Sequence, residues 1–129
     1  MAAKNPVVWF EIYVNEMERA KKFYEAVFKI ECSVLDLPEE TQENLTMLAF
    51  PMNINGSGTS GALVKVDGME AGGNSTMVYF HCDDCVVEES RVEKAGGKVS
   101  RSKQSIGAYG FVSLVYDTEG NMIGLHSMS

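Results

Sequence analysis

Hydrophobic positions along the chain follow two periods, and each period predicts a different kind of element. Between residues 17 and 28, apolar side chains recur at three- and four-residue spacing and charged residues fill the other face, which predicts an amphipathic helix capped by Asn15. Short runs of β-branched and aromatic residues predict strands. The expected strands cover residues 7–14, 31–36, 45–50, 60–66, 76–82, 98–102, 109–116 and 122–126, with a second helix at 85–95.

The same order of elements occurs in both halves of the chain. In each half a helix follows the first strand and three strands follow the helix, and a displacement of 68 residues aligns the two patterns with almost no residue identity. We therefore predict an α+β fold of two βαβββ modules in one domain of residues 1–129. Module one is expected at about residues 6–67, the flexible glycine-rich linker at about 68–75 and module two at about 76–127.

Composition and charge exclude several classes of protein. A formal charge of −7 repels a phosphate backbone, so we expect no nucleic-acid partner. No apolar run approaches the roughly 18 residues of a membrane-spanning helix, and the N-terminal residues lack the apolar stretch of a signal peptide. Three cysteines cannot all pair within one chain, which fits a reducing compartment. A cytoplasmic protein is the expectation.

Three segments carry a resemblance to a known family. Residues 14–20 with Phe23 and Tyr24, residues 78–84 and residues 117–126 are similar to the vicinal-oxygen-chelate (VOC) superfamily, which includes glyoxalase I, the bleomycin-resistance proteins and the extradiol dioxygenases. The chain looks most like the branch of predicted enzymes related to lactoylglutathione lyase. The resemblance covers essentially the whole chain. It implies two modules whose sheets curl around a cavity, usually in a homodimer.

The metal ligands of the better-known family members are missing from the matching positions. Those members hold a divalent metal through His, Gln or Glu on inward-facing strand positions, and the resemblance places three of these positions on Trp9, Met77 and Gly124. The fourth would lie between residues 58 and 66, where no Asp, Glu or His occurs. A catalytic metal needs about three protein ligands. We therefore expect no metal and no other cofactor, unless the strand register is wrong.

Alternation along the strands then predicts which side chains line the cavity. If Trp9 and Met77 face inward, so do the residues two positions away. Glu11 is the most informative of them, because a carboxylate in an apolar strand is costly to bury unless it is paired or protonated. The candidate catalytic residues are Glu11 as base, with His81 or Tyr79 stabilising negative charge. The candidate ligand contacts are Trp9, Tyr13, Met77, Gly124 and His126.

Each candidate also has a purely structural interpretation. Glu11 could bond a tyrosine or the backbone, or point to solvent, and either histidine could bond a main-chain carbonyl. The aromatic residues could belong to the core. His81 and the C-x-x-C of Cys82 and Cys85 resemble a zinc or redox motif, but no second pair exists, so we interpret both cysteines as core residues. The faces of Tyr109 and Tyr116 stay undecided.

The sequence thus predicts a glyoxalase-like protein that binds a small, partly apolar molecule without a metal. Catalysis, in the form of a lyase- or isomerase-type proton transfer, stays open. The alternatives are a protein that sequesters an antibiotic or metabolite, a structural protomer of an assembly, and a metal-dependent lyase, isomerase or dioxygenase.

Overall fold

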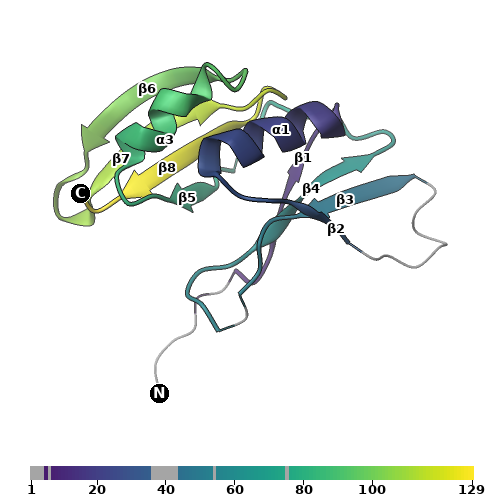
Figure 1. Cartoon of the computed structure of the whole chain (residues 1–129), viewed down its shortest axis with the longest axis horizontal. Coiled ribbons are helices and arrows are strands. Elements are labelled where there is room, and N and C mark those ends of the chain that lie inside the picture. Colours follow the sequence, from purple (N-terminus) through teal and green to yellow (C-terminus); the bar gives the residue numbers. More distant parts are fainter. Residues whose placement is uncertain (1–4, 6, 36–43, 54, 75) are drawn as a thin grey trace.

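Two four-stranded sheets carry two α-helices on a common side in the computed structural model, which describes residues 5, 7–35, 44–53, 55–74 and 76–129 (Figure 1). The first half contains β1 (Phe10–Tyr13), α1 (Met17–Phe28), β2 (Ser33–Val34), β3 (Leu45–Ala49) and β4 (Gly61–Val66). The second half contains β5 (Tyr79–His81), α3 (Cys85–Val92), β6 (Lys98–Ser105), the 3-10 helix η1 (Gly107–Tyr109), β7 (Phe111–Tyr116) and β8 (Met122–Ser127). The predicted α+β class is confirmed.

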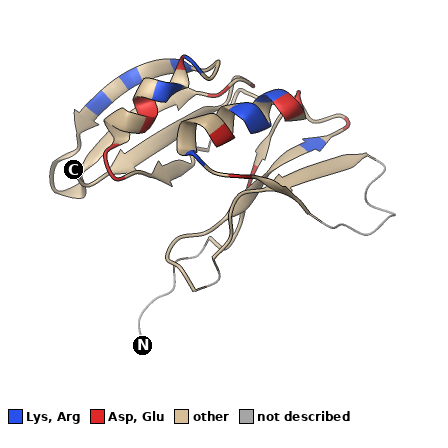
Figure 2. Ribbon diagram, in the orientation of Figure 1, with Lys and Arg blue, Asp and Glu red and all other residues tan. Residues whose placement is uncertain are grey.

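The two sheets have the same topology. Their strand orders are β1-β4-β3-β2 and β5-β8-β7-β6, and in each sheet the first pair is parallel and the others are antiparallel. β1 and β5 are therefore both edge strands. The sheets do not close into a barrel, so the face opposite the helices is open in both of them. Lys and Arg gather on α1, α3 and β6 (Figure 2).

Both halves contribute to a single hydrophobic core beneath the helices. Phe23, Tyr24 and Val27 of α1 are buried against strands of both sheets. Aromatic rings from the two halves meet there, with the Phe28 and Phe80 rings stacked at 4.5 Å between centroids. Because each sheet presents its apolar face to this shared core, the halves stabilise one another.

Several elements differ at their ends from the predicted ones. β5 is shorter than predicted, and β6 runs on to Ser105. The strand expected at 31–36 is limited to Ser33–Val34, with residue 36 outside the described part of the chain. Asp84 caps α3 by accepting a hydrogen bond from the Val86 N–H. Asn15 does not cap α1, because its side chain bonds the linker instead.

Hydrogen bonds join the glycine-rich linker to other parts of the chain. The Ala71 N–H donates to Asn15 Oδ1 at 3.0 Å, and the Gly72 N–H donates to Asn121 Oδ1 at 2.7 Å. Asn74 exchanges hydrogen bonds with the backbone of Met122. Side chains outside the linker accept two of these four hydrogen bonds, and Asn74 within it makes the other two, so the contacts depend on residues far apart in the chain.

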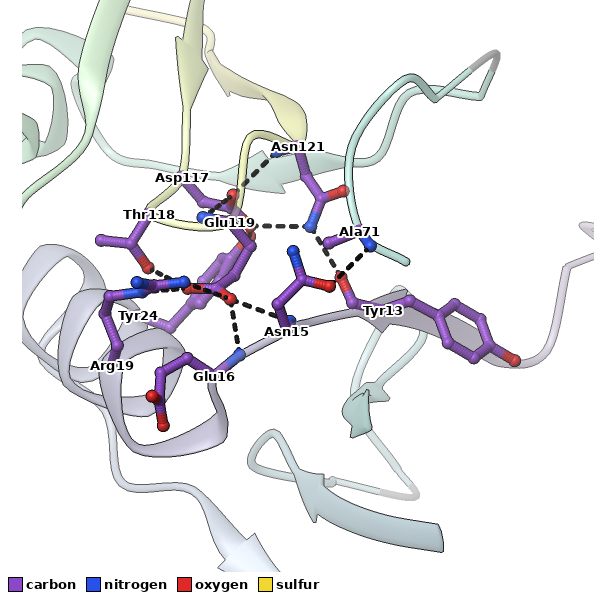
Figure 3. Close-up of polar contacts among 10 residues, drawn as sticks. All are labelled: Tyr13, Asn15, Glu16, Arg19, Tyr24, Ala71, Asp117, Thr118, Glu119 and Asn121. Atoms are coloured by element: carbon purple, nitrogen blue, oxygen red, sulfur yellow. Dashed lines mark hydrogen bonds and ion pairs between the residues drawn. The ribbon is translucent and has the colours of Figure 1, made fainter. Parts of the chain in front are cut away.

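The turn at residues 117–121 binds the N-terminus of α1 through a buried carboxylate (Figure 3). Glu119 Oε1 accepts hydrogen bonds from the backbone N–H groups of Asn15 and Glu16, each at 2.8 Å. Arg19 Nε lies 2.7 Å from the other oxygen. Burial alone would raise the pKa of Glu119, but the hydrogen bonds from Arg19, Glu16, Thr118 and Asn15 outweigh it and lower the pKa to about 2.

Asp117 extends this contact into the core. Its carboxylate accepts hydrogen bonds from the Tyr24 hydroxyl at 2.7 Å and from the backbone N–H groups of Glu119 and Asn121. The Asn121 side chain donates to the carbonyl oxygen of Tyr13 at 2.8 Å, while the Tyr13 ring points away from the turn (Figure 3). The turn therefore joins β8 to β1, α1 and the linker together.

We expect Glu119→Gln to lower the free energy of unfolding at neutral pH by about 2–4 kcal/mol, because an amide cannot replace a charged acceptor of several donors. In the folded protein the Glu119 pKa is about 2, against an ordinary 4.5, so its stabilisation is complete above about pH 4.5 and is lost as the pH falls toward 2. Urea unfolding at pH 7 and pH 3 measures both effects.

The exposed Glu93 offers a matched control, since Glu93→Gln makes the same chemical change away from the turn. Equal stability losses in the two variants would contradict the assigned role of Glu119.

Candidate functional site

The candidate residues of β1 lie on the face of the sheet opposite α1, which we call the open face. Side chains alternate along the strand, so Ile12 enters the core and its two neighbours point the other way. The strand registers place Tyr116 beside Met122 on the open face of the second sheet, which decides its orientation. The half-buried apolar side chains of the open face include Leu45, Met47, Val66, Val112, Leu114, Tyr116 and Met122.

Glu11 is held between two aromatic donors on this face. The Trp9 indole N–H donates to Glu11 Oε2 at 3.3 Å, and the Tyr13 hydroxyl donates to Oε1 at 2.9 Å. Glu11 is exposed, so the burial cost expected from the sequence does not arise. The hydrogen bond to Glu11, together with burial and the Glu11 charge, raises the pKa of Tyr13. The phenol therefore stays protonated at neutral pH and keeps the carboxylate oriented.

Tyr79 occupies the space above Gly124. The two residues are partners in the parallel pair of β5 and β8. A Cβ built on Gly124 would lie 2.3 Å from Cδ2 of the Tyr79 ring, a distance that no real contact allows. We expected Gly124 to contact a ligand in a cavity, but the half-exposed Tyr79 ring fills the space above it. Glycine at 124 is what permits the ring to lie flat on the sheet.

The two histidines have different surroundings. The side chain of His81 is 82% exposed, and its Nε2 lies 3.8 Å from Asp83 Oδ1. His126 Nε2 lies 2.7 Å from the carbonyl oxygen of Tyr109, which matches the structural interpretation of this residue. Tyr109 itself is in the 3-10 helix η1 and is largely exposed. The described hydrogen bonds join neither histidine to Glu11.

The candidates line three clefts instead of one. Glu11 and Tyr13 line a cleft of about 190 Å³ together with the linker residues 69–72. Trp9 lines a second cleft of about 400 Å³ beside the loop at 51–60. Tyr79 and His81 line a third, of about 720 Å³. Met77 is half-buried and lines none of the three. The sequence did not predict that linker residues line a cleft, because nothing in their composition distinguishes a cleft wall from a solvent-exposed connection.

The donor sets of the described residues show what the site can hold. No three His, Cys, Asp or Glu side chains converge as metal ligands within the described ranges. The indole nitrogen of Trp9 is a hydrogen-bond donor only and offers no lone pair to a cation. Burial and the nearby Glu88 charge raise the pKa of Cys82 to about 12, so this buried thiol is not a thiolate ligand or nucleophile.

Gly124→Ala is expected to destabilise the protein by about 1–2 kcal/mol, because the methyl group must displace the Tyr79 ring. In a Tyr79→Ala background the same change should be neutral or stabilising, since alanine suits a strand better than glycine. Denaturant unfolding of the four proteins of this double-mutant cycle measures the coupling. An equal cost in both backgrounds would show that the ring is not the obstacle.

The fold and the open face define a class of small α+β proteins built from a repeated strand–helix–three-strand unit. A family model of the Glyoxalase/Bleomycin resistance protein/Dioxygenase superfamily matches residues 7–125, and the chain belongs to this superfamily. The predicted VOC resemblance is thereby confirmed. No curated protein sequence matches significantly. In the described part of the chain, no helix combines the length and apolar composition needed to cross a bilayer.

Solved structures share the fold at low sequence identity. Glyoxalase I from Zea mays is similar with a TM-score of 0.74 and 20% identity, over 95% of this chain and 46% of the maize chain, so the protein spans about half of that enzyme. The trypanothione-dependent glyoxalase I of Leishmania major matches with a TM-score of 0.70 and 17% identity, over 97% and 88% of the two chains. TnmS3, an antibiotic binding protein from a Streptomyces species, matches over the full length of both chains with a TM-score of 0.67 and 24% identity.

Proposed function

We propose that the protein binds a small, partly apolar organic molecule at the open face, with Glu11 as its polar anchor and no metal. The observation that carries this proposal is the pair of hydrogen bonds from Trp9 and Tyr13 to Glu11. They fix an exposed carboxylate between two aromatic rings, beside a cleft whose walls also include Met69 and Val78. Apolar walls with a few oriented polar groups are typical of small-molecule sites.

The residues at the family's metal positions do not fit a metal. The Trp9 indole N–H is engaged with Glu11, and a ligand side chain at Gly124 would collide with the Tyr79 ring. Met77 offers a thioether, which suits soft metals only. These two contacts and the thioether of Met77 support a site that recognises its ligand through hydrogen bonds and apolar contact.

Binding is favoured over proton transfer by the arrangement of the acid–base candidates. Proton transfer needs a second group within reach of the substrate beside the Glu11 base. Tyr79 and His81, the expected partners, line a different cleft from Glu11. The full-length likeness to an antibiotic binding protein supports the same preference. We place the protein in the cytoplasm, which fits its three free cysteines.

A thermal-shift screen against metabolites and antibiotics tests the proposal. A ligand at 100 times its dissociation constant should add about 2.7 kcal/mol to the free energy of unfolding. Glu11→Gln should weaken the binding of a hit at least tenfold. Glu18→Gln, the same change at an exposed position on α1, should leave the affinity unchanged.

Two results would contradict this function. Hits that bind Glu11→Gln as tightly as the unaltered protein would remove Glu11 from the site. Near-stoichiometric zinc, nickel or iron in protein purified without added metal, lost in a His81 or His126 variant, would contradict metal-free binding.

We further propose that the protein forms a homodimer through the part of the open face that lies outside the Glu11 cleft. Half-buried apolar side chains of both sheets, among them Met47, Leu114 and Tyr116, lie there without a covering element in the described chain. Twofold pairing is the commonest way to cover such a surface. Light scattering at micromolar concentration should give twice the mass of the chain, and a monomer would contradict the proposal.

A further inference from the structure

A cleft of about 720 Å³ lies at the junction of the two sheets, where the edge strands β1 and β5 approach the C-terminal end of α1. We call it the junction cleft. Its lining includes Phe10 of β1, Phe28 at the end of α1 and Phe80 of β5, with Thr59 and Ser60 from the loop before β4. Its volume suits a drug-sized molecule. Glu11 does not line it, so the junction cleft is separate from the proposed binding site.

Aromatic rings form most of its apolar wall. The Phe80 ring lies 4.5 Å from Phe28, 5.7 Å from Phe50 and 6.0 Å from Phe10, measured between ring centroids. Phe10, Phe28 and Phe80 are only half-buried, so part of their ring surface faces the cleft. Ring faces attract cations as well as apolar groups.

One carboxylate interrupts this apolar wall. Glu88 of α3 lines the cleft, and its Oε1 atom is buried with no hydrogen-bond donor among the described residues other than the Cys82 thiol. A buried carboxylate oxygen without a strong donor is costly. The adjacent Cys82 thiol does not neutralise it, because a thiol is a weak, uncharged donor. Among the described residues that line the cleft there is no Lys or Arg, and the imidazole of His81 also lies in the lining. Figure 2 shows Lys and Arg mainly on α1 and β6.

The geometry points to a small organic ammonium ion with an apolar, aromatic or aliphatic body as the ligand of the junction cleft. The ammonium group would pair with the Glu88 carboxylate, and the body would lie on the phenylalanine rings. A carboxylate or phosphate ligand would be repelled by Glu88, with no Lys or Arg among the described lining residues to balance it. The formal charge of −7 also attracts cations to the protein over longer distances.

Three probes with one body and different charges test this assignment by isothermal titration calorimetry at pH 7. 4-Phenylbutylamine should bind at least tenfold more tightly than 4-phenylbutan-1-ol, and 4-phenylbutyrate should bind most weakly. Glu88→Gln should remove the preference for the amine. Glu93→Gln, the same change at the exposed end of α3, should preserve it.

Binding of the amine, the alcohol and the carboxylate to the unaltered protein tests the proposed ammonium preference without any variant. Equal affinities for amine and alcohol, or no saturable binding of the amine at millimolar concentration, would overturn the assignment. A preference that survives Glu88→Gln would also overturn it. Glu11→Gln should not change amine binding, so this proposal and the proposed function at Glu11 can fail independently.

Discussion

The ion pair and hydrogen bonds of Glu119 are the contacts on which the arrangement of the two halves depends. A single carboxylate from the second half accepts hydrogen bonds from the N–H groups of Asn15 and Glu16, which immediately precede α1, together with the guanidinium of Arg19. Because the acceptor comes from residue 119 and the donors from residues 15–19, the position of α1 relative to β8 is fixed by charge as well as by packing. These contacts therefore also fix how the strands of the open face are positioned on the opposite side of the sheets.

The helix side and the open side of the sheets have different chemical characters. On the helix side, buried aliphatic and aromatic residues from both halves form one core, and its polar groups are bonded to one another. On the open side, many strand residues are half-buried or exposed, and the hydrogen bonds of Glu11 come from its sequence neighbours Trp9 and Tyr13. The polar groups of the open face, above all the Glu11 carboxylate, are therefore not used in packing and can contact a ligand.

Hydrophobic periodicity was sufficient to predict the order of elements and the α+β class, because helix and strand periods are local properties. It also predicted that Trp9, Glu11 and Tyr13 share one face. It could not predict that the linker is bound by Asn15 and Asn121, since those contacts join residues far apart in the chain. The same limit applies to Glu88, which looks like an ordinary charged residue of an amphipathic helix until the walls around it are assembled.

The contact of Tyr79 with Gly124 has a consequence for how this chain can change by mutation. Any side chain introduced at 124 meets the ring first, so a substitution there costs less stability once Tyr79 has been replaced by something smaller. The two positions are epistatic: the order in which they mutate decides which intermediates fold well. A lineage that acquires this tyrosine loses stability when a single substitution places a coordinating side chain at this position of β8.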